Sequence, residues 1–133
     1  EEWIYAYLKT GEWANLGLLE GLQKQQRWWI GPIEVKLSSL TRACGPEPEM
    51  EYREPQVAWD ARVTKMEQGL SAPLDTPPLI VEYKAGVLSI RDGNHRHEAM
   101  RRQGWQKCWI VLWHDSLQDF AESKTRLHWI TTE

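Results

Sequence analysis

The residues best able to do chemistry lie together in the run RDGNHRHE at positions 91–98. An apolar, strand-like pattern ends where this run begins, and a helical pattern follows it. The first turn of a helix presents unpaired backbone N–H groups and a partial positive charge, and a glycine lets a ligand approach the backbone. The junction therefore predicts a phosphate-binding site formed by Gly93, Asn94, His95 and Arg96.

Asp92 precedes that glycine and has two interpretations. Its carboxylate can accept backbone N–H groups as a helix cap, or it can contact a metal ion or activate a hydroxyl group. The sequence leaves both interpretations open.

Charge is distributed unevenly around the junction. Residues 84–107 carry six basic side chains against two acidic ones, and residues 45–60 carry five acidic side chains against one basic one. This pattern could place carboxylates for a divalent metal beside a basic phosphate site, although both segments are also typical of solvated faces. The whole chain has a net charge of −3, so we do not expect nucleic-acid binding through an extended basic surface.

Hydrophobic periodicity and turn residues predict the elements that position the junction. Apolar residues at positions 59, 63, 66 and 70 are spaced as on one helical face, and Gly104 follows a second helical pattern as a C-terminal cap. The predicted order is one or two helices within 3–26, a strand over 33–37, an acidic loop over 44–55, a helix over 56–69, a hairpin of 79–83 and 87–91, a helix over 94–103, a buried strand over 108–113 and a last helix capped by Asp115 or Ser116.

Length and composition indicate a folded domain. The chain has 133 residues, of which 41% are hydrophobic and 26% charged, as in globular proteins. We predict an N-terminal helical extension over 1–30 and a main domain over 31–133. The sequence contains no apolar run that could span a membrane and no secretion signal, so we expect a cytoplasmic protein without a membrane partner. Because the first residue is Glu and not Met, the sequence leaves open whether flanking sequence is missing.

A zinc site is not predicted from the histidines and cysteines. His95 and His97 are two residues apart, a spacing that points them to different sides of a helix, and no HExxH or CxxC motif accompanies them. Cys108 lies within an apolar strand pattern and is expected in the core, whereas the sequence does not decide the role of Cys44.

The stretch PPLIVEYKAGVLSIRDGNHRHEAMRRQGWQKCWIVLW resembles the ParB and sulfiredoxin superfamily. In that superfamily a glycine-containing turn with an arginine, set between a strand and a helix, binds nucleotide phosphates. The upstream order agrees, and the resemblance covers roughly residues 32–114. It implies an α/β (α+β) fold with a small mixed sheet flanked by helices, to which the N-terminal helical extension is added.

Members of that superfamily differ in activity, and the turn in this chain differs from several of theirs. Asn94 stands where sulfiredoxin has its catalytic cysteine, so sulfinic acid reduction is not expected. Partition proteins usually have a Gly-Glu-Arg-Arg turn and continue into a helix-turn-helix domain, so a self-sufficient DNA clamp is not expected either. The Asp-Gly-His-Thr-Arg turn of free serine kinases is more similar. That resemblance implies Glu47 or Glu49 as a base and Asp92 near the metal and the phosphates.

Together, the junction and the resemblance predict a domain that binds CTP, ATP or ADP with Mg²⁺. Asp92 would be the metal ligand, and NTP hydrolysis or phosphoryl transfer to a small hydroxyl acceptor would involve Asp92, Glu47 and Glu49. The alternatives are a non-catalytic regulatory or DNA-associated module of partition or transcription type, and a ParB-like nuclease. Such a module would act with a protein partner, as a homodimer, or with DNA through a missing segment.

Overall fold

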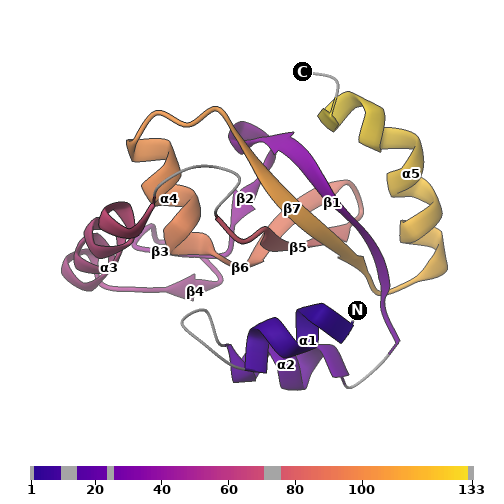
Figure 1. Ribbon diagram of the computed structural model, residues 1–133, viewed down its shortest axis with the longest axis horizontal. Helices are drawn as coiled ribbons and strands as arrows, with labels where there is room; N and C mark the ends of the chain where they lie inside the picture. The colour runs from indigo at the N-terminus through magenta and orange to yellow at the C-terminus, as the bar shows by residue number, and fades with distance from the viewer. Residues whose placement is uncertain (1, 10–14, 24–25, 71–75, 132–133) are drawn as a thin grey trace.

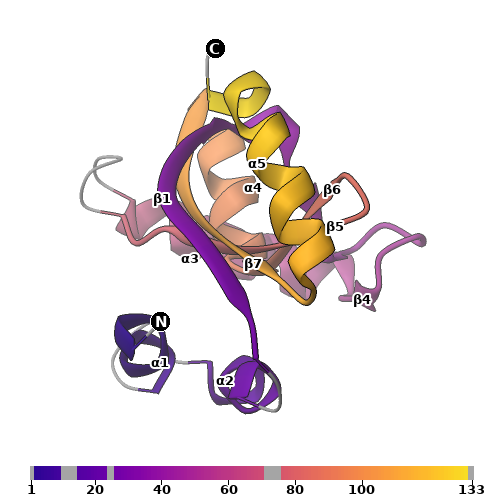
Figure 2. The ribbon, with the colours of Figure 1, turned by 90° about the vertical axis from the view of Figure 1, so that its right-hand side faces the viewer.

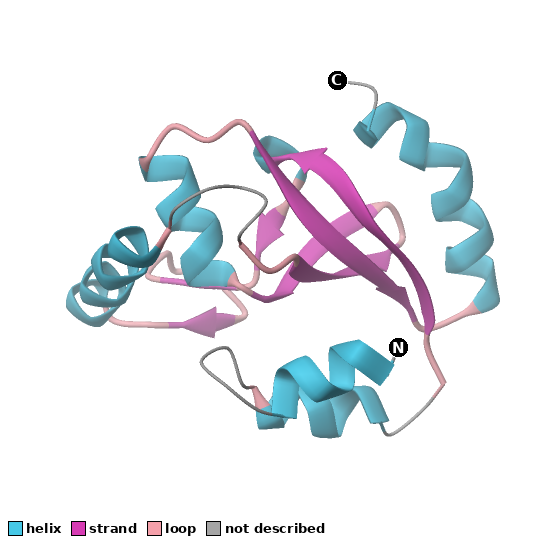
Figure 3. Cartoon of the chain, viewed as in Figure 1, coloured by secondary structure: helices cyan, strands magenta, loops and turns pink. Residues whose placement is uncertain are grey.

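The computed structural model describes residues 2–9, 15–23, 26–70 and 76–131 (Figures 1 and 3). The elements follow the predicted order, with helices at both ends and a sheet between them. They are α1 (Glu2–Lys9), α2 (Leu16–Gln23), β1 (Trp28–Lys36), the 3-10 turn η1 (Leu37–Ser39), β2 (Thr41–Arg42), β3 (Cys44–Gly45), β4 (Tyr52–Arg53), α3 (Gln56–Gly69), β5 (Leu79–Lys84), β6 (Val87–Asp92), α4 (Asn94–Arg102), β7 (Lys107–His114) and α5 (Leu117–Thr131).

Five of the strands form one mixed sheet in the order β1-β7-β5-β6-β2. The β1/β7 and β5/β6 pairs are antiparallel, whereas β5/β7 and β2/β6 are parallel. A separate pair of short parallel strands, β3 and β4, lies within the segment predicted as an acidic loop. The prediction of a mixed sheet flanked by helices is confirmed.

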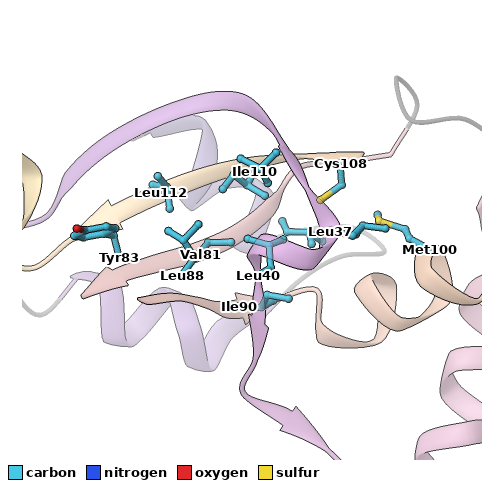
Figure 4. Close-up of a cluster of buried hydrophobic side chains, with 12 residues drawn as sticks. Leu37, Leu40, Val81, Tyr83, Leu88, Ile90, Met100, Cys108, Ile110 and Leu112 are labelled. Carbon is cyan, nitrogen blue, oxygen red and sulfur yellow. The ribbon is translucent and has the colours of Figure 1, made fainter. Parts of the chain in front are cut away.

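Alternation along β5 and β7 gives each face of the sheet its own hydrophobic core. One face carries Leu79, Val81, Ile110 and Leu112, which pack with Met100 of α4 (Figure 4). The other face carries Ile80, Val111 and Trp113, on which α1 and α2 pack through Ile4, Leu8, Leu19 and Leu22. Figure 2 shows α1 and α2 side by side below the sheet. The N-terminal helical extension is thus part of the fold and buries one sheet face.

The first strand begins earlier than the sequence predicted. Gly31-Pro32 was interpreted as a turn before a strand at 33–37, but β1 already starts at Trp28 and its pairing with β7 shifts between Ile30 and Ile33. Gly31 has a φ of +122°, so the two residues form an irregularity within the strand. β1 therefore crosses the predicted limit of the extension at residue 30.

The helix limits agree closely with the prediction. α3 covers 56–69 as expected, and Gly104 follows α4 with a φ of +82°, as the left-handed cap position requires. The amide of Asp119 donates to Ser116 Oγ at 3.1 Å, which confirms the capping role of Ser116. Among the helices of the described ranges, none is long and apolar enough to cross a membrane.

Two buried histidines make stability depend on pH. Burial lowers the pKa of His97 and of His114 below the ordinary value. His114 Nδ1 donates to Trp28 O at 2.8 Å, so its neutral Nε2 can accept from Ser123 Oγ at 2.7 Å. These rings take up a proton more readily in the unfolded chain than in the folded chain. Their contribution to the free energy of unfolding is therefore full at neutral pH and is lost as the pH falls below about 6.5.

We therefore expect the free energy of unfolding to decrease from about pH 7.5 to about pH 5. Urea denaturation followed by circular dichroism at each pH measures it. In a His114→Gln variant, which cannot be protonated there, the decrease should be smaller. An unchanged slope in that variant would contradict the assignment to His114.

Candidate functional site

The predicted phosphate site lies where β6 ends and α4 begins. Gly93 occupies the N-cap position of α4 with a φ of +104°, a conformation that favours glycine. A Cβ at this position would lie 2.4 Å from Leu79 Cδ2, inside van der Waals contact. Both observations explain why glycine is needed between this strand and this helix.

Asn94 links the start of α4 to the backbone where the acidic loop begins. Its Oδ1 accepts from the amides of Ala43 at 2.8 Å and Cys44 at 3.2 Å, and its Nδ2 donates to Ile90 O at 3.2 Å. The residue is buried. The Asn94 side chain is therefore used in hydrogen bonds within the protein.

Arg96 is 2% exposed, so its side chain is buried. Its Nη1 donates to Pro77 O at 2.8 Å, and its Nη2 lies 3.1 Å from Asp92 Oδ2. The i, i+4 spacing of Asp92 and Arg96 brings them together across the first turn. The guanidinium is therefore beside the helix N-terminus, as predicted, but it is already held by protein groups.

Asp92 does not occupy the cap position, because Gly93 does. Its carboxylate instead contacts Arg96 and accepts from Asn15 Nδ2 at 3.1 Å. Tyr7 of α1 is also close: burial raises the pKa of Tyr7 to about 12, with Arg96 opposing and Asp92 adding to this rise. The N-terminal segment thus covers one side of the junction.

The two other predicted catalytic residues lie in the acidic loop. Glu47 is in an ion pair with Arg42 at 2.5 Å, and Glu49 is exposed. Burial is the largest single influence and acts to raise the pKa of Glu47, but the hydrogen bond from Arg42, a backbone hydrogen bond and the charge of Arg42 together outweigh it, so the pKa is lowered. Glu47 and Asp92 are therefore held in different ion pairs, Glu47 with Arg42 and Asp92 with Arg96.

His95 points to a cluster that the sequence did not predict. Its Nε2 lies 3.1 Å from Glu54 Oε2, and Cys44 Sγ lies 3.6 Å from the same oxygen. Burial and then the Glu54 carboxylate raise the pKa of the Cys44 thiol. No single motif signals this cluster, because it depends on β3 and β4 pairing at the two ends of a Pro-rich loop.

Two pockets in the described part of the chain are lined by residues other than 93–96 at the start of α4. A pocket of about 500 Å³ at the other end of α4 is lined by Lys36, Arg101 and Lys107 together with His97 and Trp105. A second, of about 530 Å³, lies between α2 and the β5/β6 hairpin and includes Arg27, Glu82 and Arg91. Residues that line the first pocket are basic or neutral, so it is a second place where an anion could bind.

Comparisons with known proteins give a limited result. No family model matches the chain, and no curated protein matches it. Among solved structures, a Pnob8-like ParB-N domain is similar, with 16% sequence identity and a TM-score of 0.39. The match covers 81% of this chain and 37% of that chain. At this level of similarity, no ligand, activity or residue role is transferred from that domain.

Proposed function

We propose that this chain is a nucleotide-binding module that holds phosphate groups at the N-terminus of α4. The observation that carries the proposal is the ion pair of Arg96 and Asp92 at the first turn of that helix. A guanidinium beside unpaired helix N–H groups is the combination that phosphate prefers. Because Gly93 has no Cβ, a phosphate can approach the backbone closely at this position.

The residues present suit both the phosphate and the metal ion that the prediction requires. The Asp92 carboxylate accepts a hydrogen bond from Arg96, as a phosphate oxygen would. Phosphate binding would exchange these partners, so that Arg96 turns to the phosphate and Asp92 becomes free for Mg²⁺, which prefers oxygen ligands. When bound, Mg²⁺ would neutralise part of the phosphate charge.

Binding without turnover is the form of this proposal that we favour. In-line phosphoryl transfer needs a base and a metal-binding carboxylate at one reacting centre. Glu47 is instead paired with Arg42, and Asp92 with Arg96, while Asn15 lies against Asp92. A regulatory module whose N-terminal helices respond to the nucleotide fits these contacts better than a kinase does.

Calorimetric titration with CTP, ATP, GTP and ADP, each with and without Mg²⁺, tests the proposal. We expect one nucleotide to bind in a Mg²⁺-dependent manner, with no product after prolonged incubation. Product that accumulates in proportion to enzyme would favour the catalytic alternative. The absence of binding by every nucleotide would overturn the proposal.

Asp92→Asn separates the two roles assigned to that carboxylate. Without Mg²⁺ the variant should bind the nucleotide roughly three- to tenfold more tightly than the unmodified chain, because no carboxylate competes for Arg96. Addition of Mg²⁺ should then give little further gain. Asp119→Asn, at the start of α5, is the matched control and should keep the original Mg²⁺ dependence.

A further variant locates the bound nucleotide. Lys107→Ala removes a cation from the basic pocket at the other end of α4 and should leave affinity unchanged. If Lys107→Ala weakens binding and Asp92→Asn does not alter it, the phosphates lie in that pocket and not at the N-terminus of α4.

A further inference from the structure

Three side chains with metal-binding atoms converge on the side of α4 that faces the acidic loop. They are Cys44 from β3, Glu54 just after β4, and His95 in the first turn of α4. One ligand atom from each lies within 4.8 Å of the other two. All three residues are half-buried, unlike the exposed carboxylates that gather by chance on protein surfaces.

Two of the three distances between the ligand atoms are close to those around a tetrahedral zinc ion, and the third is within 4.8 Å. Zinc lies about 2.3 Å from a thiolate and about 2.0–2.2 Å from an imidazole nitrogen or carboxylate oxygen, so its ligand atoms are about 3.4–3.6 Å apart. Cys44 Sγ and Glu54 Oε2 are 3.6 Å apart, and His95 Nε2 and Glu54 Oε2 are 3.1 Å apart. Small side-chain rotations would bring all three to bonding distance.

The backbone holds these side chains in place without a metal. The amide of Glu54 donates to Gly45 O at 2.9 Å, which fixes Glu54 beside the strand that carries Cys44. The amide of Cys44 donates to Asn94 Oδ1 at 3.2 Å, and Asn94 precedes His95 in α4. The ring of His95 packs on Trp59, with the ring centroids 4.6 Å apart. A pre-organised set of ligands reduces the ordering cost of binding.

Neighbouring charges are compatible with a divalent cation. A thiolate and a carboxylate together neutralise the charge of Zn²⁺. Arg62 lies 3.6 Å from Glu54 Oε1, but its side chain is 65% exposed and can turn to solvent. The other oxygen of Glu54, Oε2, is the one that Cys44 and His95 share.

We propose that Cys44, Glu54 and His95 bind a zinc ion, with a fourth coordination position left for water. A thiolate, an imidazole and a carboxylate form a mixed ligand set that suits Zn²⁺ and does not suit Mg²⁺. On binding, the thiol proton of Cys44 passes to solvent as the S–Zn bond forms. This site does not depend on nucleotide binding at the junction.

Titration with Co²⁺ in the absence of nucleotide tests this site directly. We expect one Co²⁺ per chain, with a thiolate-to-cobalt charge-transfer band in the near ultraviolet and visible bands typical of tetrahedral geometry. Stoichiometric Zn²⁺ should remove these bands. A folded chain that shows no charge-transfer band, or a band that Zn²⁺ does not remove, would overturn the proposal.

Single substitutions assign the ligands. Cys44→Ser should abolish the charge-transfer band, and His95→Gln and Glu54→Gln should each weaken Co²⁺ binding by at least about a hundredfold, since each removes a ligand. Cys108→Ala and Glu51→Gln are the matched controls and should retain the band and the affinity, with circular dichroism confirming that every variant is folded. If the band persists in Cys44→Ser or disappears in Cys108→Ala, the thiolate is not Cys44 and the proposed site is wrong.

Discussion

Replacing Arg96 with alanine is expected to destabilise the folded chain by about 3–5 kcal/mol, because it leaves a largely buried carboxylate without its cation. Arg96 is 2% exposed, and its partner Asp92 has a side chain that is 13% exposed. The substitution also removes the donor to Pro77 O, which links α4 to the segment before β5. Urea denaturation of the two chains at neutral pH measures the difference.

Two controls separate loss of the ion pair from general damage to α4. Arg101→Ala removes a 63% exposed arginine from the same helix and should cost no more than about 1 kcal/mol, because Arg102 still pairs with Glu98, the partner of Arg101. Adding Asp92→Asn to Arg96→Ala should restore part of the stability, because the unpaired charge is removed with it. A loss of less than about 1.5 kcal/mol for Arg96→Ala would mean that water or another group readily replaces the guanidinium.

This expected loss changes how a binding experiment on Arg96 must be interpreted. From the sequence alone, Arg96→Ala is expected to remove a ligand contact and leave the fold intact. With Arg96 in an internal ion pair, failure of that variant to bind nucleotide would not distinguish a lost contact from a lost fold. Asp92→Asn leaves the guanidinium in place, so it is the more informative substitution.

The sequence predicted the elements well where periodicity and turn residues act locally. The apolar spacing of Trp59 and Val63, the glycine after α4 and the cap at Ser116 each depend on neighbours within a few residues. The start of β1 was missed because Gly31-Pro32 is a turn signal in isolation. Pairing with β7 overrides that signal on both sides of Gly31.

The sequence predicted the junction between β6 and α4, but not the partners of the side chains around it. Gly93 and the helix start at Asn94 follow from local sequence, and both are where they were expected. The partners of Arg96 and Asp92 include Pro77 and Asn15, and Asn15 is 77 residues from Asp92 in the chain. Contacts of that separation depend on how α1 and α2 pack on the sheet, which no local pattern encodes.

Replacing Trp59 with alanine is expected to cost about 3–5 kcal/mol, since it removes a large side chain from a closed contact between α3 and α4. Trp59 is 1% exposed and packs with Val63 and Ala99. Thermal or urea denaturation of the variant measures the loss. Val57→Ala, at an 83% exposed position of the same helix, is the control and should change stability by no more than about 0.5 kcal/mol.

The same substitution links stability to the proposed metal site. The indole of Trp59 packs against the His95 ring on one side, and the guanidinium of Arg42 lies 4.8 Å from its centroid. Trp59→Phe keeps an aromatic surface for His95 and should therefore retain more Co²⁺ affinity than Trp59→Ala at conditions where both are folded. Equal affinities in the two variants would show that backbone hydrogen bonds alone orient His95. In that case the arrangement of Cys44, Glu54 and His95 depends on the β3/β4 pair and on Asn94, and α3 contributes only to the stability of the fold.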